Sequence, residues 1–371
     1  MIPSEKFAWL IIFSPALITG FIYFNDLINY FEFKLLNDLK FKDITIDASA
    51  DIKNTRIGKI YNGLDATEGD LQLNVTGDGM HVTGPLKLAD IPLTIDWTEN
   101  FGSEVDIRTD LKAEIPLIRP LGLEKLGIPV ADYLEGPVSL SLALENGADD
   151  KGVVQIAANL QDAVLNLDDL TYKKETGLPG QIQAIISLVD GKAVNVDSFN
   201  LEANDLLAQG SLALDDGSIS RAKLEQFHLG KSLLTNVNVD LRSDKPIIFI
   251  GGGVLDATRF ISDEERQTPA NQNAQKVPEA DQVIDPEDET TAPITVIAEN
   301  LDAIYMSEDR FFRKATLWLD KEAEGWKRMQ FSGEIPKELW YAEGVKANPE
   351  TANVLRTFSL AYQPLEDGRQ G

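Results

Sequence analysis

Residues 138–160 read VSLSLALENGADDKGVVQIAANL, and this stretch is the strongest indication of the fold class. Every second residue of 138–144 is Val or Leu, and small or polar residues lie between them. Successive side chains of a β-strand point to opposite faces, so this alternation places the apolar set on one face. Asn-Gly within 146–150 is a hairpin signal, and alternation resumes in 153–160. The stretch therefore predicts an antiparallel hairpin with one apolar face.

The same period-two pattern continues along the chain from about residue 44, with turn signals such as Asp190-Gly191 and Asp215-Asp216-Gly217 between the runs. We expect roughly 16–20 strands, mostly joined as antiparallel hairpins. Residues 117–134 are the exception and predict a helical turn or two, limited by prolines. Alternation alone leaves three architectures open: a closed barrel, a stacked sandwich, or one open, curled sheet. The apolar face is accordingly either a packed core or a surface that a ligand covers.

The N-terminal region contains an apolar run, FAWLIIFSPALITGFIYF, which spans the 18 residues from Phe7 to Phe24 without a charge. A helix needs about 20 such residues to cross the hydrocarbon core of a bilayer. Trp9 and Tyr23 lie near its ends, where aromatic rings favour the membrane interface. We predict an uncleaved transmembrane anchor; a cleavable signal peptide and a buried helix are the alternatives, although no small-x-small cleavage site follows. Basic and acidic residues balance on both sides, so the charges do not orient the anchor.

Composition excludes several classes of function. The 371 residues include 34 basic and 60 acidic side chains, which gives a net charge of −26. This charge repels phosphate backbones, so we expect no nucleic-acid partner, and lipid contact would have to rest on apolar surface. The chain has no cysteine, which removes disulfides and thiolate chemistry. His81 and His228 each lie among alternating apolar residues and are interpreted as strand side chains.

One segment differs in kind from the rest. Residues 264–293, EERQTPANQNAQKVPEADQVIDPEDETTAP, contain almost no large apolar side chain, and we predict a disordered acidic linker. The sequence thus divides into a membrane anchor (1–30), a β-sheet region (31–263), the linker (264–293) and a continuation of the β region with a frayed C-terminus (294–371).

The sequence contains no recognisable catalytic motif. The run Gly251-Gly252-Gly253 does not match the G-x-G-x-x-G fingerprint of dinucleotide-binding proteins, because the last glycine of that motif is missing. No helical periodicity follows the run. It predicts a glycine kink or bulge at the end of the preceding strand. No nucleophile elbow, calcium loop, Walker loop or zinc signature occurs. We expect a protein that is not an enzyme, with no catalytic residue, cofactor or metal site.

Five stretches, taken in order, resemble the AsmA-like proteins of the YhdP type from Gram-negative envelopes. They are ATEGDLQLNVTGDGMHVTGPLKLADIPLTIDWTENF (66–101), YLEGPVSLSLAL (133–144), VVQIAANLQDAVLNLDDLTYKKETGLPG (153–180), FNLEANDLLAQGSLAL (199–214) and IIFIGGGVLDATRFI (247–261). The third includes Lys173, Gly177 and Gly180 at the positions of the family pattern. The resemblance covers roughly residues 33–362, although relatives are much longer.

The resemblance implies an all-β, curled, mostly antiparallel sheet with an apolar groove and an N-terminal transmembrane helix. It implies a non-enzymatic protein of the inner membrane, with a single pass and a periplasmic bulk, that moves phospholipids between the inner and outer membranes. The expected partners are the inner membrane, phospholipid acyl chains and, as a further candidate, another envelope protein. The alternatives are a structural or assembly protein that binds a partner through its sheet edges, or a truncated, inactive paralogue. The candidate lipid-facing residues are Leu71, Leu73, Val75, Val138, Leu140, Leu142, Leu144, Ile156, Ala158, Leu165, Leu167, Ile186 and Leu188.

Overall fold

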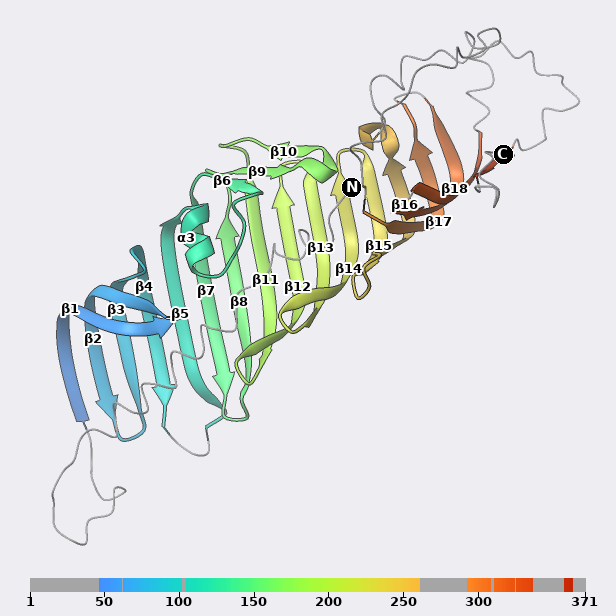
Figure 1. Cartoon of the computed structure of the whole chain (residues 1–371). Coiled ribbons are helices and arrows are strands. Elements are labelled where there is room, and N and C mark those ends of the chain that lie inside the picture. The colour runs from blue at the N-terminus through green and yellow to red at the C-terminus, as the bar shows by residue number, and fades with distance from the viewer. Residues whose placement is uncertain are drawn as a thin grey trace, which may run out of the picture. The chain divides into compact units, whose positions relative to one another are not determined.

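The computed structural model describes residues 47–61, 63–101, 105–260, 292–307, 310–323, 325–335 and 357–362. The chain is all-β: strands hold 74% of these residues and form a large, curled, mostly antiparallel sheet, which confirms the sheet part of the predicted fold (Figure 1). The predicted anchor and residues 264–291 of the predicted linker lie outside the described part. Within that part, no helix combines the length and the hydropathy that crossing a bilayer requires.

The described residues divide into two compact units. We call residues 47–167 with 173–222 the N-terminal unit and residues 168–172 with 223–362 the C-terminal unit; the division falls within β10 and β14. The strands are β1 (Asp47–Tyr61), β2 (Leu64–Thr76), β3 (Gly79–Leu88), β4 (Ile91–Asn100), β5 (Ile107–Ile118), β6 (Leu134–Glu135), β7 (Val138–Gly147), β8 (Lys151–Asn159), β9 (Val164–Leu167), β10 (Tyr172–Lys174), β11 (Gly180–Val189), β12 (Lys192–Ala203), β13 (Leu206–Asp215), β14 (Ser218–Leu229), β15 (Ser232–Asp240), β16 (Ile247–Asp256), β17 (Ile294–Tyr305), β18 (Phe311–Glu322), β19 (Gly325–Glu334) and β20 (Thr357–Tyr362).

The N-terminal unit is an antiparallel series. Its strands pair in the order β1, β2, β3, β4, β5, β7, β8, β11, β12 and β13, so each is hydrogen-bonded to its neighbour in this series. The chain leaves the large sheet twice. It forms α3 (Pro120–Lys125) and β6 between β5 and β7, and β9 between β8 and β11. Helix α3 confirms the helical turn predicted for 117–134.

The hairpin turns use the residues that the sequence indicates. Asp190 and Gly191, between β11 and β12, have φ angles of 49° and 73°. Asp216 and Gly217, between β13 and β14, have φ angles of 47° and 80°. Two consecutive positive φ angles are typical of the tight turns whose twist matches that of the flanking strands.

The C-terminal unit departs from the hairpin pattern at one place. Strand β16 pairs with β17 in parallel, from Ile247 opposite Thr295 to Asp256 opposite Tyr305, whereas β15–β16, β17–β18, β18–β19 and β19–β20 are antiparallel. Parallel neighbours need a long crossover, because the chain must return to the end of the sheet from which it started. The acidic segment predicted as a linker lies within this crossover connection.

The glycine run lies inside a strand rather than at its end. All three glycines belong to β16, and the pairing with β17 shifts register between Gly253 and Val254. The predicted bulge is therefore confirmed, but the strand continues through it to Asp256. Gly253 has a φ of +107°, a conformation that other residues rarely adopt.

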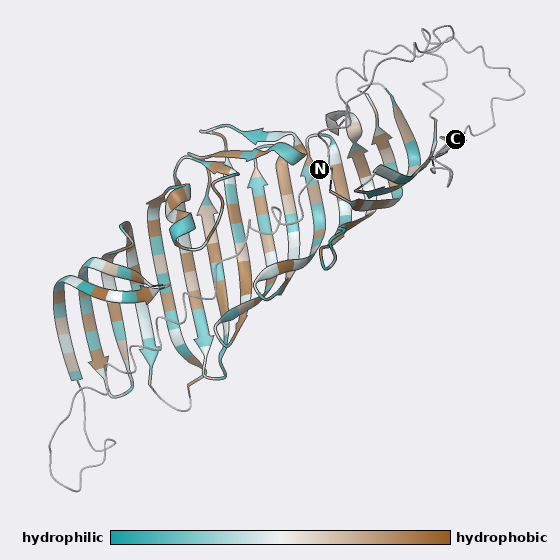
Figure 2. Cartoon of the chain, viewed as in Figure 1, coloured by the Kyte–Doolittle hydropathy of each residue, from teal (hydrophilic) through white to brown (hydrophobic). Residues whose placement is uncertain are grey.

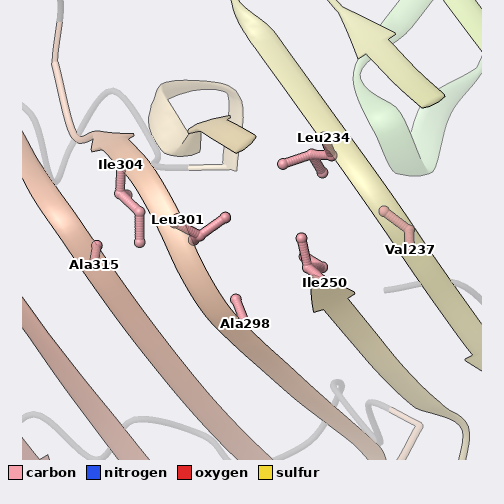
Figure 3. Close-up of a cluster of buried hydrophobic side chains, with 7 residues drawn as sticks. All are labelled: Leu234, Val237, Ile250, Ala298, Leu301, Ile304 and Ala315. Carbon is pink, nitrogen blue, oxygen red and sulfur yellow. The ribbon is translucent and has the colours of Figure 1, made fainter. Parts of the chain in front are cut away.

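The core of the C-terminal unit comes from one face of β15 to β18. Seven apolar side chains meet there, and Figure 3 shows them pointing into the same region: Leu234, Val237, Ile250, Ala298, Leu301, Ile304 and Ala315. Phe312 and Phe331 pack against this cluster and contact each other edge to face, with ring centroids 4.9 Å apart.

Candidate functional site: the apolar face of the sheet

A row of apolar side chains crosses the N-terminal unit, one from each of eight neighbouring strands. We call it the central row; register pairing connects Val82, Trp97, Leu111, Leu144, Val154, Ile186, Val196 and Leu212. The exposed fractions of these side chains lie between 1% and 8%. Because directly paired residues of antiparallel strands share a face, the row is one uninterrupted apolar line perpendicular to the strands.

Two further rows, which we call the flanking rows, lie on the same face and follow one another on one side of the central row. They are Ile95, Ala113, Leu142, Ile156, Ala184 and Phe199, and Ile115, Leu140, Ala158, Ile182, Leu201 and Ala208. Figure 2 shows the corresponding alternation of apolar and polar residues along the strands. The rows arise because the hairpins of this unit keep their period-two patterns in register from strand to strand.

Eleven of the predicted lipid-facing residues lie on strands of the large sheet. Three belong to the central row or to its continuation toward β1, namely Leu73, Leu144 and Ile186. Four belong to the flanking rows, namely Leu140, Leu142, Ile156 and Ala158. The other four lie elsewhere on these strands, namely Leu71, Val75, Val138 and Leu188.

The last two predicted residues lie outside the large sheet. Leu165 and Leu167 belong to β9, in the small sheet with β6. The alternation could not separate β9 from the large sheet, because a short strand of a separate sheet has the same side-chain period.

Several residues of the rows are absent from the predicted set, notably Leu111, Val196, Phe199 and Leu212. Each belongs to a strand with its own alternation, so the sequence does carry a signal for them. For Val196 and Phe199, a register shift in β12 obscures it, because the pairing with β13 slips between these two residues. A one-residue slip exchanges the two faces of a strand in the sequence pattern.

Small elements pack along one margin of the apolar face. Helix α3 and strands β6 and β9 lie together at this edge of the sheet (Figure 1). Gly122 of α3 lies against the side chains of Ile118 and Ile91, and a Cβ at this position would come within 2.8 Å of Ile118. The N-terminal unit has no second large sheet among the residues that the structure describes. Helix α3 therefore covers part of the apolar face at this margin.

The margin is held by a buried cation, Lys174. Its side chain is 0% exposed, and Nζ donates to the carbonyl oxygens of Ala163 at 2.7 Å, Glu175 at 3.2 Å and Gln161 at 3.5 Å. Burial lowers the pKa of Lys174, and the carboxylate of Asp162 opposes this shift. The ammonium group joins backbone segments on both sides of β9, so it fixes the fold of this margin.

A hollow of about 640 Å³ lies beside the ends of β5, β7, β8, β11 and β12. Its lining includes the polar side chains of Glu114, Gln181 and Glu202, and also Leu140, Ala158 and Ile182 of a flanking row. Glu202 accepts hydrogen bonds from Asn200 at 2.8 Å and Gln181 at 2.9 Å, and these bonds lower its pKa. A carboxylate held in this way stays ionised and is a poor proton donor.

One acidic side chain lies close to the apolar face. Glu99 Oε2 accepts hydrogen bonds from Thr109 Oγ1 at 2.8 Å and from Trp97 Nε1 at 3.3 Å, and Trp97 belongs to the central row. Burial raises the pKa of Glu99 above its ordinary 4.5, although both hydrogen bonds oppose the shift. Relative to the unfolded chain, the folded state therefore favours the protonated form.

Because the folded-state pKa of Glu99 is raised, protonation of this residue stabilises the folded state, and this stabilisation is complete below pH 4.5. It is lost as the pH rises through the folded-state pKa. We expect Glu99→Gln to be more stable than the parent at pH 7, with an advantage that shrinks as the pH falls toward 4.5. Urea unfolding between pH 4.5 and 7 measures this, with the exposed Glu145→Gln as control. An advantage of Glu99→Gln that does not change with pH would contradict the prediction.

No metal-binding group emerges from the described residues: nowhere among them do three or more His, Asp or Glu side chains gather so that they could hold an ion. The chain was compared with protein-family models, with curated proteins and with solved structures. None of them matches.

Proposed function

We propose that this chain is a non-enzymatic protein of the cell envelope that offers the apolar face of its curled sheet to phospholipid acyl chains, and so serves lipid transport between the inner and outer membranes. The observation that carries the proposal is the central row, an uninterrupted line of apolar side chains across eight strands. An acyl chain needs a continuous apolar path, because each methylene group exposed to water costs about 0.8 kcal/mol.

The dimensions of the row support this proposal. Neighbouring strands lie about 4.8 Å apart, so the seven intervals between β3 and β13 span about 34 Å. The hydrocarbon core of a bilayer, which contains two acyl chains end to end, is about 30 Å thick. The row is therefore long enough to accompany an acyl chain over its whole length.

The envelope location of the proposal rests on two features of the sequence. One is the apolar run from Phe7 to Phe24, and the other is the resemblance of the five ordered stretches to AsmA-like proteins of the YhdP type. The excess of acidic over basic residues is consistent with a face that contacts lipid acyl chains through apolar side chains rather than through a basic patch.

A protein partner bound through the sheet edge is the competing proposal, and the features of β1 do not favour it. The strand is irregular at two places, where Asn54 and Lys59 have φ angles of 49° and 55°. Their N–H groups donate to the carboxylates of Asp70 and Asp65 on β2, each at 3.0 Å. Bulges of this kind twist an edge strand and hinder the addition of another strand.

The proposal is tested by photocrosslinking with a phospholipid that carries a photoreactive group in its acyl chain. We expect native mass spectrometry of the full chain to detect bound phospholipid, and the crosslinks to map to the apolar rows. Val154 and Val153 are neighbours on β8 with opposite orientations: Val154 belongs to the central row, whereas Val153 is 37% exposed on the other face. We expect Val154→Thr to reduce crosslinking several-fold, because the hydroxyl group interrupts the apolar line.

The matched control is Val153→Thr, which introduces the same hydroxyl group on the polar face and is expected to leave crosslinking unchanged. Thermal unfolding of both variants shows whether the sheet is intact. The absence of bound lipid together with crosslinks confined to the polar face would refute the proposal and favour a dry structural core.

A further inference from the structure

The hollow beside the ends of β5, β7, β8, β11 and β12 is lined by two neighbouring rows of small and polar side chains. Register pairing joins Ser141, Ala157 and Gln183 in the first row. The second row consists of Ser139, Asn159, Gln181 and Glu202. Along each strand these residues alternate with those of the flanking rows, so their side chains point to the face opposite the apolar rows.

The rim of the hollow is fixed by backbone hydrogen bonds. Asn204 N donates to the carbonyl oxygen of Pro179 at 3.0 Å, and Gly177 N donates to that of Gln161 at 2.8 Å. Asn204, Pro179 and Gln161 all belong to the lining. Walls that are already ordered reduce the entropy lost when a ligand binds.

The lining limits the chemistry of a ligand. A volume of about 640 Å³ lies within the range of about 300–1,000 Å³ that is typical of small-molecule sites. Among the described residues, no basic side chain lines the hollow, whereas Glu114 and Glu202 bring carboxyl groups to it. This lining repels phosphates and carboxylates, and a purely apolar ligand would leave its polar side chains without partners. The hollow therefore favours a small polar ligand without negative charge.

Hydroxyl groups complement this lining better than ammonium groups do. The side chains of Ser139, Ser141 and Gln183 have no hydrogen-bond partner among the described residues, and each offers both a donor and an acceptor. A hydroxyl group likewise donates and accepts, whereas an ammonium group only donates. The carboxylate of Glu202 already accepts two hydrogen bonds from within the sheet, so it is partly engaged.

We propose that this hollow binds a neutral mono- or disaccharide, whose hydroxyl groups form hydrogen bonds with Ser139, Ser141 and Gln183. Sugar rings also present C–H groups, and Ala157 and Pro179 of the lining offer apolar surface to them. The inference goes beyond the proposed function, because these side chains lie on the face opposite the apolar rows and need no acyl chain.

Saturation-transfer difference NMR of the full chain with maltose and with N,N′-diacetylchitobiose tests the site, since this method detects weak binding. We expect a signal from at least one of these sugars. Ala157→Ile should reduce that signal several-fold, because the larger side chain occupies the hollow while a β-branched residue remains suited to a strand. The matched control is Ala143→Ile: Ala143 lies on β7 on the same face, opposite Gln155, and is not part of the lining. It is expected to leave the signal unchanged.

A second pair of variants keeps the test valid if Ala157→Ile unfolds, which thermal unfolding shows. Gln183→Met removes an exposed amide group without filling the hollow and should also weaken binding, whereas Gln155→Met, on the same face outside the lining, should not. Equal signals from the parent and the lining variants, or no signal from either sugar, would refute the proposal. Stronger binding of spermidine would assign the hollow to a polyamine instead, and stronger binding of glucuronate would show that its carboxyl groups do not exclude anions; either result would overturn the sugar site.

Discussion

Replacement of the buried Lys174 by methionine is expected to lower the free energy of unfolding by roughly 3 kcal/mol. Methionine fills a similar volume but has no hydrogen-bond donor, so the carbonyl groups of Ala163, Glu175 and Gln161 lose their shared partner. The carbonyl groups of Gln161 and Glu175 keep the amides of Gly177 and Leu178 as donors, so the main loss falls on the carbonyl group of Ala163. A buried polar group without a partner costs about 1–3 kcal/mol. The effect should be concentrated at the margin of the apolar face that contains β9.

Hydrogen exchange can localise this effect. The amides of Leu160 and Gly177 donate to the carbonyl groups of Gly180 and Gln161, each at 2.8 Å, and should lose protection in Lys174→Met. Lys173→Met is the matched control, since the adjacent lysine is exposed and its ion pair with Glu175, at 3.0 Å, lies at the surface. Equal unfolding and exchange in the two variants would show that Lys174 does not hold this margin.

Replacement of Gly253 by alanine is expected to destabilise the C-terminal unit by roughly 3–5 kcal/mol. Gly253 has a φ of +107°, and a Cβ at this position would overlap the carbonyl oxygen of Leu233 on β15. The backbone of two strands would have to move, because neither group is a flexible side-chain end. The register shift between Gly253 and Val254 would be disturbed at the same time.

The neighbouring glycine provides the control for this prediction. A Cβ at Gly252 would meet Asn300 O and Thr235 Oγ1 at 3.5 Å, which is ordinary van der Waals contact. Gly252→Ala is therefore expected to change the free energy of unfolding far less than Gly253→Ala. Chemical unfolding followed by tryptophan fluorescence compares the two, because Trp318 and Trp326 both lie in the C-terminal unit. Similar midpoints for the two variants would contradict the assigned role of Gly253.

Much of the fold follows from local rules. The alternation in 138–160 predicts β7 and β8, and the Asp-Gly pairs predict the turns after β11 and β13. These predictions succeed because the side-chain period of two and the backbone preference of glycine act within a few residues. The candidate face is predictable to the same extent, since most of the proposed residues lie on strands of the large sheet.

Strand pairing is what local rules do not predict. Leu165 and Leu167 show the same alternation as Leu142 and Ile156, yet they belong to a separate small sheet. Nothing within a strand specifies its neighbour, because the backbone hydrogen bonds of a sheet are the same for any partner. The parallel pairing of β16 with β17 was likewise beyond local rules, because a connection of more than thirty residues separates the strands.

That the chain forms strands with one apolar face follows from the sequence alone, because the side-chain period is a property of the individual strand. The alignment of those apolar residues into rows, with Val154 opposite Leu144 and Ile186, depends instead on the tertiary structure. So does the difference between Lys174, which is enclosed by backbone carbonyl groups, and the adjacent Lys173, whose side chain is exposed. Burial and pairing depend on residues distant in sequence, so two neighbouring lysines acquire different surroundings.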